Sequence, residues 1–455
     1  MERNLSEGSV FRNLIIFSMP YLLSYFLQTL YGMADLFIIG QYEGIASTTA
    51  VSIGSQVLHM LTVMLIGLAM GTTVSIGQDT GAGNRAQAAK DIGNTAVLFI
   101  AGSIVLTAVL LILIRPIISI MSVPEEAVSG TAAYLAICFI GIPFITAYNI
   151  ISSIFRGMGD SSTPMCFIAV ACAANILLDY FFIGVLKLGP AGAALGTVSS
   201  QAISVAVSFA YITREKLIRL KKSDLAPSRS VMRKLLSIGI PIALQDGLIQ
   251  TAFIIITVIA NQRGLDDAAA VGIVEKVMSF LFLIPSSMLS AVSSLGAQNI
   301  GRGRVDRAEK TLMYAVIIAS GFGLIMSVIV QFGAEHIIAL FTDRTTEGGM
   351  NVIRLGSQYI RGYIWDCIFA GIHFSFSGYF CACGRSGLSF LHNILAITLV
   401  RIPGVYLASK LFPGTLFPMG LATASGSLLS VIICFAAFAV IRNKKPEGIK
   451  TGNEQ

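Results

Sequence analysis

The chain has 455 residues and a net charge of +7; 55% of its residues are hydrophobic and only 12% are charged. Soluble globular proteins carry about 25% charged residues, about twice the fraction found here. The mean hydropathy of the chain is +0.79. This composition excludes a soluble enzyme, a secreted disulfide scaffold and a nucleic-acid-binding domain, and it predicts a polytopic membrane protein.

Twelve apolar runs, each of about 18 residues or more, are predicted to be transmembrane helices. The runs are too long for membrane strands and lack period-two alternation, so the predicted fold class is an all-α membrane protein. No small-residue cleavage site follows the first run, which is therefore expected to be a span and not a signal peptide. The expected spans are 13–39, 46–76, 94–114, 130–155, 164–186, 190–212, 236–260, 268–297, 311–334, 353–380, 387–409 and 414–441.

Lys and Arg are distributed unevenly among the loops. With the N-terminus inside, 22 of the 31 fall in inner loops and tails, six in outer loops and three within spans. The positive-inside rule then predicts a multi-pass protein of the cell (inner) membrane with both termini in the cytoplasm. The inner positive charge also attracts anionic lipid, so membrane lipids are expected partners and nucleic acid is not.

The two halves of the chain repeat each other. The predicted organisation is an N-lobe (1–212), a basic cytoplasmic linker (213–235), a C-lobe (236–441) and a cytoplasmic tail (442–455). Each lobe has six spans, so the repeats share one orientation and are related by a pseudo-twofold axis along the membrane normal, with a cavity between the lobes. The repeat is carried by Gln78, Gly81, Gly83, Ala88 and Lys90, which recur 220 positions later as Gln298, Gly301, Gly303, Ala308 and Lys310.

The short glycine motifs at 81–83 and 301–303 are expected to be matching turns. Neither follows a predicted strand, and no G-x-x-x-x-G-K-[ST] motif occurs, so no nucleotide is expected to bind. The seven cysteines lie in or beside apolar runs and are predicted to be free thiols. Cys381 and Cys383 lie near His373 but lack further ligands for zinc. No cofactor is expected, and no metal beyond Na⁺.

Acidic residues inside the N-lobe spans are the main candidate site. Placing an ionised side chain at membrane depth costs about 2.5–3.5 kcal/mol even on the insertion scale, so acids found there usually have a function. Helix rise places Asp35, Asp179 and Thr197 near one depth, and Asn175 lies one turn from Asp179 on the same helix face. This oxygen-rich set suits a hard cation or a proton. Alternatively, each carboxylate is a hydrogen-bonded packing residue or lies at the membrane interface.

The C-lobe candidates for coupling or substrate binding are Asp366, Glu275 and Asp246. Asp366 could instead form a structural ion pair with Arg361 or Arg401.

Other polar and helix-breaking residues of the N-lobe surround this candidate site. Pro20 is a candidate gating kink in the first span, because proline removes a backbone donor. The residues expected to line the substrate cavity of the N-lobe are Gln28, Tyr31, Tyr134 and Asn149.

A series of motifs, in order along nearly the whole chain, resembles the multidrug and toxic compound extrusion (MATE) family. The motifs are a proline-containing first span ending Tyr31-x-x-x-Asp35-(x)4-Gly40, then Gln78-Asp79-x-Gly81-Ala82-Gly83, Arg156-Gly157-x-Gly159-Asp160, Asn175-x-x-x-Asp179, and Gly192-Ala193-Ala194 followed by Thr197. The resemblance implies an antiporter that exports amphipathic or cationic organic compounds in exchange for H⁺ or Na⁺. No enzyme activity is expected, and because one two-lobed chain is sufficient for this mechanism, a functional monomer is expected. The resemblance also implies a cation site at Asp35, Asn175, Asp179 and Thr197.

The sequence is most similar in pattern to the DinF-like and MepA-like bacterial branch. The branch of sodium-driven norfloxacin exporters has a glutamate inside span 7, where this chain has Gln245 and Asp246; Asp366 occupies the place of that branch's acid in span 10. The alternative function is a lipid-linked or polyprenyl flippase, which is expected to have a strongly cationic cavity. A membrane enzyme would need a surface His/Asp motif, and the four histidines are scattered.

Overall fold

The computed structural model describes residues 5–215 and 220–443, and within these ranges the regular secondary structure is helical, without strands. Ten of these helices are long and apolar enough to cross a membrane, and one bent pair makes an eleventh span. The predicted all-α membrane fold is therefore confirmed. Residues 216–219 of the expected linker and 444–455 of the expected tail lie outside the described residues.

The first half of the chain forms the N-lobe. Its helices are α1 (Val10–Tyr42), α2 (Ile45–Gly81), α3 (Arg85–Ile112), α4 (Ile114–Ile120), α5 (Glu125–Ile140), α6 (Ile142–Gly157), α7 (Ser162–Asp179), the π-helical turn η1 (Tyr180–Val185) and α8 (Gly189–Glu215). The expected span 130–155 is in fact the pair α5 and α6, bent by 48° at Gly141.

The second half forms the C-lobe. A short 3₁₀ turn, η2 (Lys222–Leu225), precedes α9 (Arg229–Asn261), α10 (Leu265–Leu281), α11 (Leu283–Gly301), α12 (Val305–Ile338), α13 (Glu347–Tyr363), α14 (Asp366–Ala382), α15 (Ser386–Ala396), the π turn η3 (Ile397–Arg401), α16 (Ile402–Leu411) and α17 (Phe417–Asn443). The expected span 353–380 is broken at 364–365. Its two halves, α13 and α14, have only 17 residues each and are not among the apolar spans, and α13 also carries the charged residues Glu347, Arg354 and Arg361.

The matching turns predicted from the glycine motifs are confirmed. Gly83 and Gly303 have φ of +73° and +78°, the left-handed conformation that lets glycine end a helix. Their backbone N–H groups donate to Thr80 O at 3.1 Å and to Ile300 O at 2.9 Å. These two turns lie at the same end of the bundle, which we call the closed end; the loops 43–44 and 262–264 lie at the opposite, open end.

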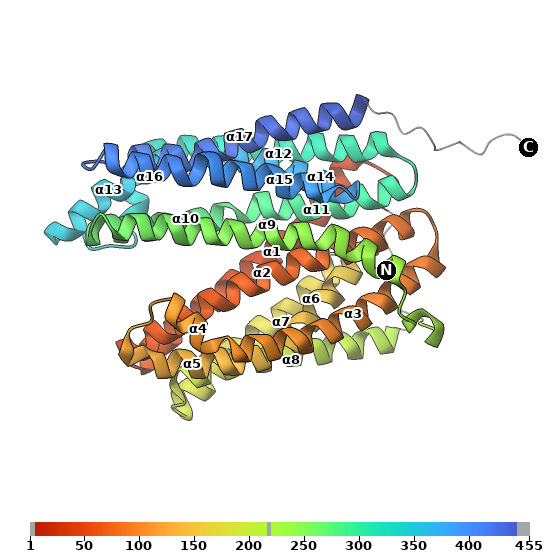
Figure 1. Cartoon of the computed structure of the whole chain (residues 1–455), viewed down its shortest axis with the longest axis horizontal. Coiled ribbons are helices and arrows are strands. Elements are labelled where there is room, and N and C mark those ends of the chain that lie inside the picture. Colours follow the sequence, from red (N-terminus) through yellow and green to blue (C-terminus); the bar gives the residue numbers. More distant parts are fainter. Residues whose placement is uncertain (1–4, 216–219, 444–455) are drawn as a thin grey trace, which may run out of the picture.

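Apolar cores exist within each lobe and between the lobes. One core joins the closed-end half of α1 to α11, α12 and α14, and another joins α2 to α9. Figure 1 shows the two groups of helices converging toward the closed end, on the right of the view, and diverging toward the open end.

Candidate functional site

Four polar side chains from three N-lobe helices meet inside the bundle. Asp35 of α1, Asn175 and Asp179 of α7 and Thr197 of α8 are 2%, 1%, 0% and 4% exposed. The Thr197 hydroxyl contacts Asp35 Oδ2 and the Ala193 carbonyl oxygen, each at 3.1 Å. The structure thus brings together the set proposed from sequence and places it within the membrane-spanning segments, with Asp179 at the junction of α7 and η1.

The two carboxyl groups of this set lie close enough to interact electrostatically. Within residues 5–215 and 220–443, no partner forms a well-aligned hydrogen bond with Asp35 Oδ1, with the amide of Asn175 or with either carboxyl oxygen of Asp179. In the same ranges, no Lys or Arg forms an ion pair with either acid. Removing two carboxylates from water without a counter-charge is very costly, so this arrangement can take up a proton or a cation.

Local helix geometry explains how the acids come so close. Asp179 is followed at once by the π turn η1, a type of distortion that often occurs at functional sites. On the facing helix, a Cβ at Gly196 would overlap Asp179 Oδ1, so glycine lets α8 approach. Sequence reasoning missed Gly196 and also Gln201, which is 4% exposed with Oε1 unpartnered among the described residues. Gln201 lies one turn from Thr197, and that spacing was the available signal.

Of the four residues expected to line the substrate cavity, the two tyrosines interact with the acid pair. Tyr31 and Tyr134 both interact electrostatically with Asp35. Asn149 donates instead to Ile145 O of its own helix at 2.9 Å. In the described part of the chain, no hydrogen bond or ion pair joins Asn149 or Gln28 to the acids. Pro20 lies inside the uninterrupted helix α1.

The C-lobe acids lie in different surroundings. Asp366 pairs with Arg401 and not with Arg361, which pairs with Glu335 at 3.5 Å. Glu275, half-buried on α10, contacts the Thr257 hydroxyl at 3.2 Å. Asp246 lies next to Gly67 of α2 and therefore at the interface between the lobes.

The closed end is held by two matching contacts between the lobes. Gln78 Nε2 donates to Ala382 O at 2.9 Å, and Gln298 Nε2 donates to Gly157 O at 2.9 Å. The turns themselves also meet: a Cβ on Gly81 would overlap the carbonyl of Gln298, and one on Gly301 would overlap that of Gln78. The repeated Gln-x-x-Gly motif therefore forms a pseudo-symmetric contact, which sequence reasoning had interpreted only as turns.

Two segments, one ahead of the first long helix of each lobe, cross between the lobes at the same end. Residues 5–9, ahead of α1, lie on the C-lobe, where Leu5 N donates to Gln298 Oε1 at 3.3 Å and Arg304 Nη1 to Ser6 O at 2.8 Å. Residues 222–228, ahead of α9, lie on the N-lobe, where Ser228 N donates to Asn94 Oδ1 at 2.6 Å.

The contacts between lobes end partway along the bundle. Tyr21 and Tyr25 of α1 share hydrogen bonds with Ser294 and Ser290 of α11, at 3.1 and 2.8 Å, and Lys234 pairs with Asp79 at 3.6 Å. Within the described ranges, all inter-lobe hydrogen bonds and ion pairs lie in the closed-end half. The acids of the N-lobe lie beyond this zone, toward the open end.

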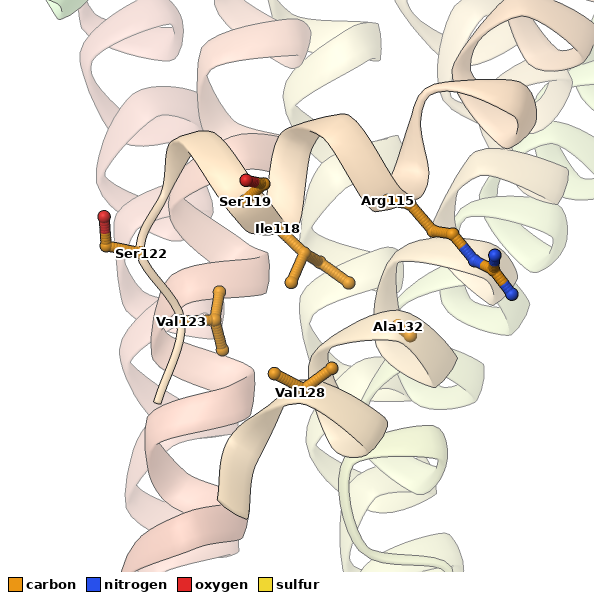
Figure 2. A pocket seen from close by; sticks show the side chains of 7 residues that line it. All are labelled: Arg115, Ile118, Ser119, Ser122, Val123, Val128 and Ala132. Carbon is orange, nitrogen blue, oxygen red and sulfur yellow. The ribbon is translucent and has the colours of Figure 1, made fainter. Parts of the chain in front are cut away.

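A separate pocket of about 470 Å³ opens between α4 and the start of α5 (Figure 2). None of the predicted site residues contributes to it, and its lining is mostly aliphatic. The lining residues are Arg115, Ile118, Ser119, Ser122, Val123, Val128 and Ala132. Elsewhere, the seven cysteines are free thiols, and no group of three metal-ligating His, Cys, Asp or Glu side chains occurs in the described part of the chain.

Known proteins resemble this chain along nearly its whole length. The MatE family model matches residues 20–181 and 241–407, one segment in each lobe. The chain is 28% identical over 452 residues to the probable multidrug resistance protein YpnP of Bacillus subtilis, covering 99% of both chains. It is 24% identical over 442 residues to the multidrug export protein MepA of Staphylococcus haemolyticus, covering 94% of both. A solved structure, described as a MATE in complex with MaL6, superposes with a TM-score of 0.89 at 21% identity, covering 96% of this chain and 97% of that one, which shows the shared fold.

Proposed function

Because the chain belongs to the MATE family, we propose that it is a secondary active antiporter that exports amphipathic or cationic organic compounds in exchange for H⁺ or Na⁺. The observation that carries this proposal is the buried pair Asp35 and Asp179, which has no basic partner among the described residues. Export of organic compounds is further supported by the names of the relatives, a probable multidrug resistance protein and a multidrug export protein.

Binding of the ion and binding of the substrate favour different arrangements of the two lobes, so each opposes the other. A proton or Na⁺ entering from outside neutralises the acid pair, with Asn175 and Thr197 as the neutral polar groups beside it. Neutralisation changes which lobe arrangement is favoured and drives substrate release. A membrane potential supplies about 2.3 kcal/mol per charge per 100 mV, enough for roughly fiftyfold accumulation of substrate at about 1.4 kcal/mol per factor of ten.

We infer that the closed end faces the cytoplasm, so the conformation described here is outward-open. The inner-loop arginines and lysines support this orientation through the positive-inside rule, and both termini then lie in the cytoplasm of a cell-membrane protein. One two-lobed chain holds the acid pair and the inter-lobe contacts, so we propose that a monomer with surrounding lipid suffices.

The test is efflux of a fluorescent organic cation from proteoliposomes, with a pH gradient and a Na⁺ gradient imposed separately. Efflux should follow one gradient and be lost in Asp35→Asn and Asp179→Asn. The matched control is Asp343→Asn at the open end: hydrogen bonds from Thr345 lower the pKa of Asp343, so this change also removes an ionised carboxylate. Normal ion-driven efflux by both bundle variants would contradict the site, and absence of efflux by the folded, unmodified chain would contradict the function.

A further inference from the structure

The two lobes neutralise their buried acids in different ways. In the N-lobe, Asp35 and Asp179 have no basic partner among the described residues, as shown above. In the C-lobe, Asp366 Oδ2 accepts a hydrogen bond from Arg401 Nη2 at 3.0 Å, with the two side chains only 1% and 9% exposed. A buried carboxylate with a fixed guanidinium next to it needs no exchangeable cation.

Arg401 is held in place by α17 as well as by Asp366 of α14. Its Nη2 also donates to Ser427 Oγ of α17 at 2.7 Å. Gly426 of the same helix faces the arginine, since a Cβ there would lie 2.8 Å from Arg401 Cβ and 3.3 Å from Nε. Arg401 is the last residue of the π turn η3, in the same span of its lobe as Asp179 and η1 in theirs. Corresponding distorted helices therefore present an acid in one lobe and a base in the other.

We propose that Arg401 is a tethered counter-ion, which occupies in the C-lobe the place that the exchanged cation takes in the N-lobe. Asp366 then stays ionised and paired throughout the cycle and is no ion-exchange site. The inference rests on the proposed antiport function. Of the three C-lobe acids singled out from the sequence, it leaves Glu275 and Asp246 without a guanidinium partner among the described residues.

The surroundings of the pair predict what happens when the arginine is removed. Asp366 Oδ1 and the hydroxyl groups of Tyr359 and Tyr363 are buried and have no hydrogen-bond partner among the described residues. Without the guanidinium, these oxygens remain beside an uncompensated carboxylate and suit a proton or a small hard cation. The titratable groups that interact with the pair are Tyr359 and Tyr363 on α13 and Cys367 and His373 on α14. Glu275 on α10 interacts in turn with the two tyrosines, and His392 on α15 interacts with His373.

The experiment measures the Tm of purified protein against Na⁺, with choline keeping the ionic strength constant, and against pH. All variants are made in the Asp35→Asn/Asp179→Asn background, which silences the N-lobe acids. The background protein should show little ion dependence. Adding Arg401→Met should create a new rise in Tm, of a few degrees, with Na⁺ or with falling pH. Adding Asp366→Asn to Arg401→Met should abolish that rise. This combination removes one positive and one negative charge, so it keeps the test valid if the protein with Arg401→Met alone folds poorly.

Two results would overturn the inference. One is an ion-dependent Tm that is removed by Asp366→Asn while Arg401 is intact, which would make Asp366 an exchange site. The other is no new ion response in folded Arg401→Met. Failure of the antiport proposal is distinguishable, because it is read from efflux by the chain with Asp35 and Asp179 intact.

Discussion

Replacing Gln78 and Gln298 together with alanine is expected to shift the protein away from the conformation closed at the 82–84 end. The double change removes three inter-lobe hydrogen bonds: Gln78 to Ala382 O, Gln298 to Gly157 O, and Leu5 N to Gln298. Each is worth about 0.5–1.5 kcal/mol net. Their sum, about 3 kcal/mol, corresponds to a change of roughly a hundredfold in the ratio of the two conformations.

Pulsed electron spin resonance distances can measure that ratio. Spin labels at Leu188 and Phe412, both exposed at the open end, report the separation of the lobes there, in a background with the native cysteines replaced. The distance distribution should move toward shorter values in the double variant, because releasing the closed end lets the open end close.

The matched control is Gln245→Ala. Gln245 is also a buried glutamine, 1% exposed, but its Oε1 accepts from Ser389 Oγ at 2.6 Å within the C-lobe. It should lose stability without a change in the distribution. An unchanged distance distribution in the double variant, or an equal shift in the control, would refute the conclusion that Gln78 and Gln298 hold the two lobes together at the closed end.

Three further changes test other parts of the account. Gly196→Ala should push the Asp179 carboxyl aside at a cost of about 1 kcal/mol, so the ion concentration needed for half-maximal transport should rise about fivefold; unaltered ion affinity would show that the close approach is unimportant. Asn94→Ala should increase amide hydrogen exchange at residues 222–228, whereas Asn393→Ala, which loses only a bond within its own helix, should not. Pro20→Ala restores a backbone donor in α1 and should slow transport at saturating ion without changing ion affinity, so an altered affinity with an unchanged rate would contradict a gating role.

The depth of the N-lobe acids was predictable because it depends only on helix rise and on the ends of apolar runs. Asp35, Asp179 and Thr197 lie in helices whose boundaries the sequence marks well, so simple counting brought them to one level. Asn175 followed from the one-turn spacing on α7. These inferences need no knowledge of how neighbouring helices rotate about their own axes.

The features that sequence could not supply depend on that rotation and on breaks in the helices. Gly196 gains its meaning only from the overlap with Asp179 across two helices. The partner of Asp366 was ambiguous because Arg361 is nearer in sequence. The break at 364–365 ends α13 before Asp366, so Arg361 turns to Glu335 and Arg401 from a distant span forms the pair. The contacts of Gln78 and Gln298 join the two lobes, so they become visible only when the position of one lobe against the other is known.

Release of an ion on substrate binding tests the central claim most directly, because binding linkage is reciprocal. A fluorescent organic cation is added to the purified protein in weakly buffered detergent solution, and released H⁺ is followed with a pH indicator or released Na⁺ with a radiotracer. The account predicts release of H⁺ or Na⁺ from the unmodified chain and none from Asp35→Asn/Asp179→Asn. Equal release from both proteins, or substrate binding with no release of either ion, would contradict it.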